Sequence, residues 1–552
     1  MKKTVLILLL LVISGNSIIA QNVLSETEKL STTAKIWGFL KYYHPNVIKG
    51  KYDWDYELVK RMSEINELKT SEDFSEYYLK WISDLGSVAP NKKQNVNTEN
   101  DYFLKNLDLD WIENSSVFNE ALKQQLNIIR DAERSNNQHY VKLDKIGNSG
   151  KAIPINEKEY SISEFPEDEN IRLLSLFRFW NFIEYFFPYK YQTDQSWGEV
   201  LKEMIPEFKN ASNSTKYHLA MLRLTTKLDD SHSSFSTTQV ENYFGKNWLP
   251  VSVKIIDDKA IVTGFYNTPY AQKDNWEIGD AITKINRVDI SDLYKDSKEL
   301  VNGSNEKAKQ RMATFKLFRS NEESIEITVE KNGKSIDKSV SLYPLNEMKE
   351  RNFNRLKWKI LEDNIGYINL GLLRVKEVRD IVENLSNTKS IIIDIRNYPL
   401  GTKDAIVAEL SEKEQECFKS IMPDLSKPGR FVWRKARKKA GRKNKDPYKG
   451  KIILLVNEET ISYAELTCMC LQTLDNVTVI GSQTAGADGN VTELKFIGGF
   501  DTNISGIGMF YPNGKETQRI GIEPDITIEQ TISGIKNGRD EILEKAIEVA
   551  IE

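Results

Sequence analysis

Residues 451–482 read KIILLVNEETISYAELTCMCLQTLDNVTVIGS, and this stretch decides the class of fold. KIILLVN and VTVIGS are short and almost continuously apolar, which is typical of strands buried on both faces of a sheet. SYAELTCMCLQTL lies between them and has the length of a helix. A buried strand, a helix and a second buried strand in this order indicate an α/β sandwich.

The same alternation extends over residues 346–552. NIGYINLG and SIIIDIRN predict two further strands, with the helical segment VKEVRDIVENLS between them. GRDEILEKAIEVAIE, at 538–552, has the apolar stripe of an amphipathic helix. We therefore expect a single α/β core over this range.

Short strands replace this pattern over residues 246–345. WEIGDAITKINRVDI joins a Gly-Asp turn to an alternating strand and then to a second turn. This stretch resembles a PDZ domain, a small module that often binds an extended peptide at a sheet edge. A plain β-rich spacer is the alternative interpretation.

The N-terminal third contains a weak internal repeat. WGFLKYYHPNVIKGKYDWDYELVKRM at 37–62 and WNFIEYFFPYKYQTDQSWGEVLKEM at 180–204 share two tryptophans, a proline and a leucine at identical spacing. Each copy predicts a helix that ends before the proline and a second helix near the second tryptophan. We interpret residues 21–95 and 168–245 as duplicated helical units, joined by a polar connector over 96–167. The fold class is thus multidomain α+β.

Length and charge set broad limits. A chain of 552 residues is too long for one hydrophobic core, which agrees with several domains. The formal charge of −4 is small for this size and gives no indication of a nucleic-acid partner. The oligomeric state stays open.

The first twenty residues, MKKTVLILLLLVISGNSIIA, have the pattern of a secretory signal. Two lysines precede a short apolar run, and Ala20 offers the cleavage point. We expect an exported protein, periplasmic or secreted, that is soluble once the signal is removed. An uncleaved anchor is the alternative, but the apolar run falls short of the ~20 residues that span a bilayer.

The three cysteines and one basic segment are the candidates for a binding role. Cys417, Cys468 and Cys470 have no neighbouring histidines, so we expect no zinc site, no other metal and no cofactor. Residues 430–451 are strongly basic and are predicted to form a solvated, mobile insertion. A rim that contacts acidic substrates or the anionic surface of a membrane is the sharper alternative.

Four short strings place polar residues where catalysis needs them. LDDSHSSF ends the second helical unit, DIRNYPLG and ISYAE each follow a buried strand, and GSQTAGADG follows the next one. Loops at strand ends are where a rigid sheet presents reactive groups. A serine at a strand-to-helix turn also lies near free backbone N–H groups.

These strings and their order resemble the tail-specific, or carboxyl-terminal processing, serine peptidases. The resemblance covers residues 168–545 and rests on GDAITKINRVDI, GYINLG, IIIDIRN, SYAE, GSQTAG and GIEPDI. It implies a helical segment and a PDZ domain before a protease core of the ClpP-like or crotonase-like α/β type. It also implies a polypeptide substrate and a nucleophile in the Ser-x-Ser/Ala-Glu string, which is Ser462 and not Ser482.

One departure from the family pattern selects the general base. Many members use a lysine just after a Thr-x-Gly turn, but Ala487 occupies that position here. The chain is more similar to the branch with tricorn-type core proteases and interphotoreceptor-retinoid-binding-protein-like proteins. Peptidases of that branch use a histidine after a short acidic string, which some members precede with a serine. DDSH supplies both residues, as Ser231 and His232.

The chemistry assigns a role to each residue. A serine hydroxyl needs a base within hydrogen-bond reach, and imidazole can take its proton and return it to the leaving amine. A third group must fix the tautomer of the ring. The resemblance places that group at Gln518, a neutral amide, and Glu516 would lie on the same face of a strand. The two residues stay open as alternatives.

The oxyanion hole is expected from backbone N–H groups. Tyr463, next to the nucleophile, supplies one, and the turn NYPLG supplies the other. Pro399 has no N–H to donate, so Leu400 or Gly401 must serve.

Other interpretations use the same residues differently. Glu465 completes a capping box with Ser462, so the serine could be only a helix cap. The other three histidines, at 44, 139 and 218, are expected to be structural. The alternative function is a catalytically silent protein that binds a peptide or an apolar ligand on the same fold. A weaker one is a scaffold acting through the duplicated helical region.

Overall fold

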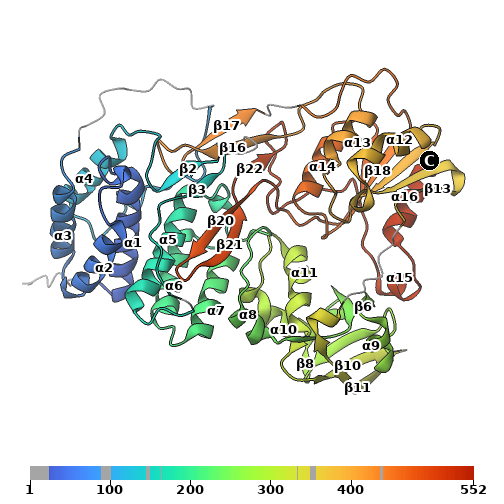
Figure 1. The fold of residues 1–552 in the computed structure, drawn as a ribbon, viewed down its shortest axis with the longest axis horizontal. Coiled ribbons are helices and arrows are strands. Elements are labelled where there is room, and N and C mark those ends of the chain that lie inside the picture. Colours follow the sequence, from blue (N-terminus) through green and yellow to red (C-terminus); the bar gives the residue numbers. More distant parts are fainter. Residues whose placement is uncertain are drawn as a thin grey trace, which may run out of the picture.

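The computed structural model describes residues 24–88, 101–144, 150–162, 164–331, 333–348, 356–435 and 439–552. The predicted signal, residues 1–20, lies outside these ranges. Within them, no helix combines the length and the apolar character that a membrane crossing requires. Helical, β-rich and mixed regions follow one another along the chain (Figure 1), which confirms the multidomain α+β class. The domain boundaries stay predictions.

A six-stranded sheet forms the α/β core, coloured yellow to red in Figure 1. Its order is β13-β14-β15-β18-β19-β23, in which β13 is antiparallel to β14 and all later pairs are parallel. The strands are β13 (Trp358–Leu361), β14 (Ile365–Asn369), β15 (Ser390–Asp394), β18 (Lys451–Val456), β19 (Val477–Gly481) and β23 (Ile526–Thr527).

Both faces of this sheet are covered by helices, which explains the continuous apolar runs. On β18, Ile452, Leu454 and Val456 belong to the same buried cluster as α12, α13 and α14. The residues between them, Ile453 and Leu455, pack with the C-terminal helix α16 on the other face. These helices are α12 (Val378–Asn384), α13 (Lys403–Leu410), α14 (Tyr463–Leu471) and α16 (Glu541–Ile551).

The repeated helical units have matching hydrogen bonds. In the first unit, the Trp37 and Trp54 indoles each donate to the other's carbonyl, at 2.8 and 3.2 Å. In the second unit, Trp180 and Trp197 do the same, at 2.8 and 3.0 Å. The helices are α1 (Glu26–Tyr43), α2 (Trp54–Glu64) and α3 (Ser71–Asp84) in the first unit, and α5 (Glu169–Phe186), α6 (Trp197–Lys209), α7 (Ser214–Thr226) and α8 (Thr238–Phe244) in the second.

The two units pack into one helical body with a shared core. Helix α1 contacts both α5 and α6, and α2 contacts α5. The close approach of α1 to α5 depends on Gly38, because a Cβ there would lie 1.6 Å from Oδ1 of Asn181. The Asn181 amide is fixed by donating to the carbonyls of Ala34 and Phe177.

The predicted connector contributes to this core. Helix α4 (Glu120–Asp131) buries Leu122, Leu126 and Ile129, three residues at helical spacing. The β-hairpin of β2 (Val141–Leu143) and β3 (Ala152–Pro154) follows it. The segment is therefore more than a polar connector. The sequence analysis does not identify this role, because the apolar stripe is short and lies among polar residues.

A second six-stranded sheet makes up the β-rich region, which follows the helical body and precedes the core in the sequence. Its order is β11-β10-β7-β6-β5, with β8 paired to β7. The elements are β5 (Val251–Ile256), β6 (Lys259–Phe265), α9 (Thr268–Lys273), β7 (Ala281–Ile285), β8 (Val288–Asp289), α10 (Ile290–Ser297), α11 (Glu306–Leu317), β10 (Ser324–Lys331) and β11 (Lys334–Ser341). It packs on the core through α15 (Ile532–Lys536), whose Ile535 contacts Ile261 and Ala281.

Where the structure describes the basic segment, at 430–435 and 439–451, it contains a strand and ion pairs that the sequence analysis does not predict. It contains β17 (Phe431–Lys435), which pairs with β16 (Lys419–Pro423) and with β1 (Tyr102–Phe103). β22 (Gly508–Phe510) completes this small sheet. Several of its cations pair with carboxylates: Arg430 with Asp424, Arg442 with Glu409 and Lys449 with Glu412.

A two-stranded hairpin connects the core to the helical body. It consists of β20 (Val491–Phe496) and β21 (Phe500–Ser505), and it lies across the helices in the centre of Figure 1. Phe496 stacks on Phe179 of α5, with ring centroids 4.8 Å apart. The hairpin is therefore fixed to the second helical unit and not to the core sheet.

The Gly38 contact gives a test of the helical body. We expect Gly38→Ala to lower the free energy of unfolding by about 1–3 kcal/mol, because overpacking outweighs the better helix propensity of alanine. Gly198→Ala is the matched control, since its Cβ would meet only Lys35 Nζ at 3.4 Å. The midpoint of denaturant unfolding reports both, and Gly38→Ala with a wild-type midpoint would refute the packing argument.

Candidate active site

Three loops leave the core sheet at the same edge. Strands β15, β18 and β19 are parallel neighbours, so their carboxyl ends lie side by side. The loops that follow them carry NYPLG, ISYAE and QTAGADG. An open α/β sheet presents its reactive groups at this edge, so the topology brings together three of the four strings singled out in the sequence.

Ser462 lies at the start of α14 in an unusual backbone conformation. Its φ is +58° and its ψ is −117°, a region that residues with a side chain rarely occupy. Such strain costs about 1–3 kcal/mol and persists only where the surroundings hold it. The side chain is partly exposed, whereas the helix behind it is mostly buried. The serine is thus held in a fixed position that solvent can reach.

The buried carboxylate of Glu465 holds this conformation. It accepts hydrogen bonds from the backbone N–H groups of Ser462 (3.0 Å), Gly486 (2.9 Å) and Ala487 (3.0 Å), and from the Thr484 hydroxyl. The contact with Ser462 is one half of the predicted capping box. The other contacts connect the serine to the turn after β19.

That turn also connects to the string before the histidine. The Ala487 carbonyl accepts from the Ser462 N–H at 2.9 Å, and the Ala485 carbonyl accepts from the Ser231 hydroxyl at 2.8 Å. Ser231 is further bonded to Ser304, which donates its N–H to the Ser231 hydroxyl at 2.8 Å. Ser231 therefore joins three segments, and its hydroxyl does not face the His232 ring.

The His232 ring has a partner at one nitrogen only. Nδ1 lies 2.8 Å from the Ser505 hydroxyl, and buried Nε2 has no hydrogen-bond partner among the described residues. Burial lowers the pKa of His232, and the carboxylate of Asp230 partly offsets this effect. The ring is therefore neutral at neutral pH, which is the state that a general base requires.

Neither predicted orienting residue contacts the His232 ring. Gln518 is buried and donates to Asp230 at 3.3 Å and to Ser304 at 3.4 Å. Glu516 points elsewhere and forms an ion pair with Lys105 at 2.6 Å. Although they are only two residues apart, Glu516 and Gln518 have different partners, because they do not belong to a regular strand.

The sequence analysis did not identify Asp230 and Ser505, which lie beside His232 in the structure. Asp230 belongs to the acidic string before His232, so its position in DDSH was the available signal. Ser505 ends β21, and nothing in the sequence NISGIG marks it as a partner of a residue 273 positions upstream.

Tyr463 follows Ser462 directly in the chain, and the other expected oxyanion donors, Leu400 and Gly401, lie in the loop after β15. Tyr463 is the first residue of α14, so its N–H has no acceptor within the helix. Its ring lies 6.4 Å from that of Tyr398, in the turn after β15. Leu400 is exposed and forms a β-bridge with Arg374, and Gly401 is exposed with a φ of +74°. The Tyr398–Tyr463 contact brings the turn after β15 to the start of α14, and the oxyanion role of Leu400 or Gly401 stays a prediction.

The loop before Ser462 is also bound from the β-rich region. Lys254 of β5 pairs with Glu458 at 2.7 Å, and Arg311 of α11 pairs with Glu459 at 2.7 Å. Glu458 is almost fully buried, so its pair is the better shielded of the two. The loop before Ser462 thus has supports on two sides, the turn after β19 and the β-rich region.

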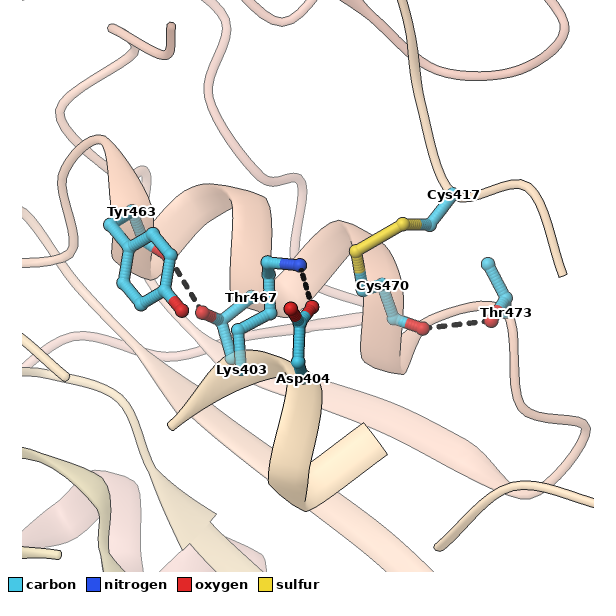
Figure 2. The surroundings of a disulfide bond; sticks show 7 residues. All are labelled: Lys403, Asp404, Cys417, Tyr463, Thr467, Cys470 and Thr473. Carbon is cyan, nitrogen blue, oxygen red and sulfur yellow. Dashed lines mark hydrogen bonds and ion pairs between the residues drawn. A yellow bond between two sulfur atoms is a disulfide. The ribbon is translucent and has the colours of Figure 1, made fainter. Parts of the chain in front are cut away.

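The far end of α14 carries a disulfide that the sequence analysis did not predict (Figure 2). Cys470 is bonded to Cys417, and their Cα atoms are 4.7 Å apart. Cys468, two residues earlier on the helix, is buried and unpaired. The disulfide ties the helix of Ser462 to the segment before β16.

The described residues show no group of three or more histidines, cysteines or acids arranged for a metal. Two of the remaining histidines have structural contacts. His44 is fully buried and accepts from the Asn46 N–H, and His218 lies 2.7 Å from the Thr237 hydroxyl.

Comparisons with known proteins agree with this architecture. The family model described as "Peptidase family S41" matches residues 364–528, and the model described as "PDZ domain" matches residues 245–365. Residues 364–528 form a peptidase family S41 domain. The resemblance to tail-specific peptidases is therefore confirmed, and the match supports a serine-type peptidase, the enzyme class that the sequence predicts.

Relatives outside the family models are distant. The carboxy-terminal processing protease CtpA of Bacillus subtilis (strain 168) is 21% identical over 319 residues, which cover 56% of this chain and 63% of the relative. The chain thus spans less than two thirds of that protein. The structure of mature CPAF complexed with lactacystin has a TM-score of 0.56 at 12% identity, covering 69% of this chain and 98% of that one. The photosystem II D1 C-terminal processing protease has a TM-score of 0.41 at 13% identity, covering 70% and 98%. The likeness to CPAF shows a shared fold.

Glu465 gives a test of how Ser462 is held. Glu465→Gln replaces an acceptor oxygen by an amide donor that faces backbone N–H groups, so we expect Ser462 to shift and kcat to fall about 100-fold. Glu459→Gln, in the same loop but half exposed, is the control and should retain activity. Activity of Glu465→Gln within a few-fold of wild type would contradict the positioning role.

The same residue predicts a dependence of stability on pH. Burial raises the pKa of Glu465 from 4.5 to about 7, against the opposing effect of its hydrogen-bond donors. Because the folded state binds this proton more tightly, the contribution to stability is complete below pH 4.5 and is lost as the pH rises through about 7. In Glu465→Gln, the midpoint of denaturant unfolding should not show this loss of stability as the pH rises. Parallel pH curves for the variant and the wild type would contradict it.

Proposed function

We propose that this protein is an exported serine peptidase that hydrolyses peptide bonds through an acyl-enzyme on Ser462, with His232 as general base. The observation that carries the proposal is the turn 485–487, which bonds to the Ser462 backbone and to the residue before His232. The strained conformation of Ser462 and the unpartnered Nε2 of His232 support it.

The residues provide each step of acyl transfer. Nε2 of His232 takes the proton of the Ser462 hydroxyl as its oxygen attacks the substrate carbonyl. The Tyr463 N–H and an N–H of Leu400 or Gly401 hold the negative oxygen that forms. Nε2 then gives its proton to the leaving amine, and a water repeats the sequence to release the acid and restore Ser462.

Export and the partners belong to the same proposal. The disulfide between Cys417 and Cys470 supports an oxidising compartment, as the signal-like start of the sequence does. A polypeptide is the proposed substrate. Membrane contact through 430–451 has less support, because Arg430, Arg442 and Lys449 each pair with a carboxylate.

A fluorophosphonate probe tests the nucleophile. We expect the purified wild type to be labelled at Ser462 and Ser462→Ala to remain unlabelled. Ser482→Ala is the matched control, because Ser482 follows the neighbouring strand at the same edge and should not be required. An unlabelled wild type, with equal peptide affinity in Ser462→Ala, would favour the silent binding protein that Pro399 in the oxyanion turn suggests.

The pH profile tests the base. Since burial lowers the pKa of His232, the ring stays neutral to lower pH than a free imidazole. The acid limb of kcat/KM should therefore have its midpoint below the ordinary value of 6.5. His232→Gln should remove this limb and lower kcat/KM by about 1,000-fold or more. An acid limb that His232→Gln leaves unchanged would exclude His232 as the base.

A further inference from the structure

The Nδ1 atom of His232 faces a hydroxyl and not a carboxylate. The hydroxyl belongs to Ser505, at the end of β21, and the oxygen lies 2.8 Å from Nδ1. Ser505 has no exposed surface. The contact joins the loop after α7 to the hairpin, and neither segment belongs to the core sheet.

The direction of this hydrogen bond follows from Asp230. The carboxylate is 1% exposed and accepts from four donors: the Ser505 hydroxyl (2.9 Å), the Ser505 N–H (2.7 Å), the His232 N–H (3.0 Å) and the Gln518 amide (3.3 Å). An ionised carboxylate only accepts hydrogen bonds. The single hydroxyl proton of Ser505 therefore points at Asp230, and the Ser505 oxygen offers a lone pair to the ring.

This direction fixes the tautomer of His232. A lone pair at Ser505 requires a proton on Nδ1 of the neutral ring, which leaves Nε2 unprotonated. The bond is thus Nδ1–H donating to Ser505, which donates to Asp230. Nε2, the nitrogen without a partner, carries the lone pair that a general base uses.

We infer that Ser505 and Asp230 are the positioning residues of His232, and that the hydroxyl replaces direct contact with a carboxylate. The inference rests on the proposed function and deepens it. Gln518 acts one step further out, because its amide donates to Asp230. When Nε2 takes the Ser462 proton, that proton stays on the ring, and Asp230 stabilises the imidazolium through the Ser505 dipole without being protonated.

The surroundings of Asp230 match this role. The adjacent Asp229 turns to other partners, with its carboxylate 2.6 Å from Lys309 and 2.8 Å from the Asp194 N–H. Arg519 pairs with Asp194 at 2.6 Å. Asp230 is the charged group that raises the pKa of the His232 ring, against the larger effect of burial. The acidic pair in DDSH therefore divides into one carboxylate for structure and one for the base.

Kinetics of Ser505 variants test the inference. We expect Ser505→Ala to lower kcat about 100-fold or more with KM little changed, as a lost tautomer lock does. Ser505→Thr keeps the hydroxyl and should recover most of this loss. Ser234→Ala is the matched control, because this exposed serine faces Asn503 of the same strand and should behave like wild type.

The tautomer itself can be read without activity. The chain has four histidines, so ¹⁵N-detected imidazole spectra can be assigned by comparison with His232→Gln. The wild type should show His232 protonated at Nδ1. In Asp230→Asn an amide faces the Ser505 hydroxyl and can reverse its direction, so the signal should change to protonation at Nε2 or to a mixture.

The outcomes separate this inference from the proposed function. An active wild type with unchanged kcat in Ser505→Ala, or a wild type protonated at Nε2, would overturn the positioning role while the peptidase stands. An inert wild type with the Nδ1–H tautomer that Asp230→Asn removes would support the hydrogen-bond chain and overturn the peptidase. Unfolding midpoints near wild type in Ser505→Ala exclude loss of the fold as the cause of a kinetic effect.

Discussion

The site depends on one buried carboxylate, that of Glu465. Its oxygens are shared between the backbone of Ser462 and the turn after β19, so two neighbouring loops are held by one group. Without these acceptors, the N–H groups of Gly486 and Ala487 would lose their partner, each at a cost of about 1–3 kcal/mol. The hydrogen bonds from the surrounding backbone to Glu465 hold Ser462 in its strained conformation. A helix cap and a nucleophile are therefore compatible descriptions of the same residue.

The second half of the site is built outside the sheet. Asp230 and His232 follow α7, and Ser505 ends a hairpin that packs on α5. The apolar contact of Phe496 with Phe179 supplies the stability, while the polar groups at the hairpin's end supply the hydrogen bonds. The large shared core of the duplicated helical units thus has a consequence for chemistry, because it fixes where His232, the proposed base, lies.

Much of this could be predicted from the sequence, and the limits have physical causes. Periodicity gave the core strands around residues 391–393 and 452–456, because burial on both faces leaves only apolar residues there. The repeat followed from tryptophan spacing. The partner of His232 could not be found, because Ser505 meets the ring through long-range packing and a serine after a short strand carries no periodic signal. The sequence predicts that Glu516 and Gln518 share a strand face, but the backbone there is irregular and their side chains have different partners.

The anchoring of the hairpin on α5 has a mechanical meaning. His232, Asp230 and Ser505 all belong to the helical body, whereas Ser462 and Glu465 belong to the sheet. The seam between the two hydrophobic cores therefore passes between Ser462, the proposed nucleophile, and His232, the proposed base. Any displacement along that seam would change the distance between Ser462 and His232 and leave the ring's own hydrogen bonds intact. The hydrogen bonds from Ser231 to the Ala485 carbonyl and from Gln518 to Asp230 cross this seam and hold the two parts in register.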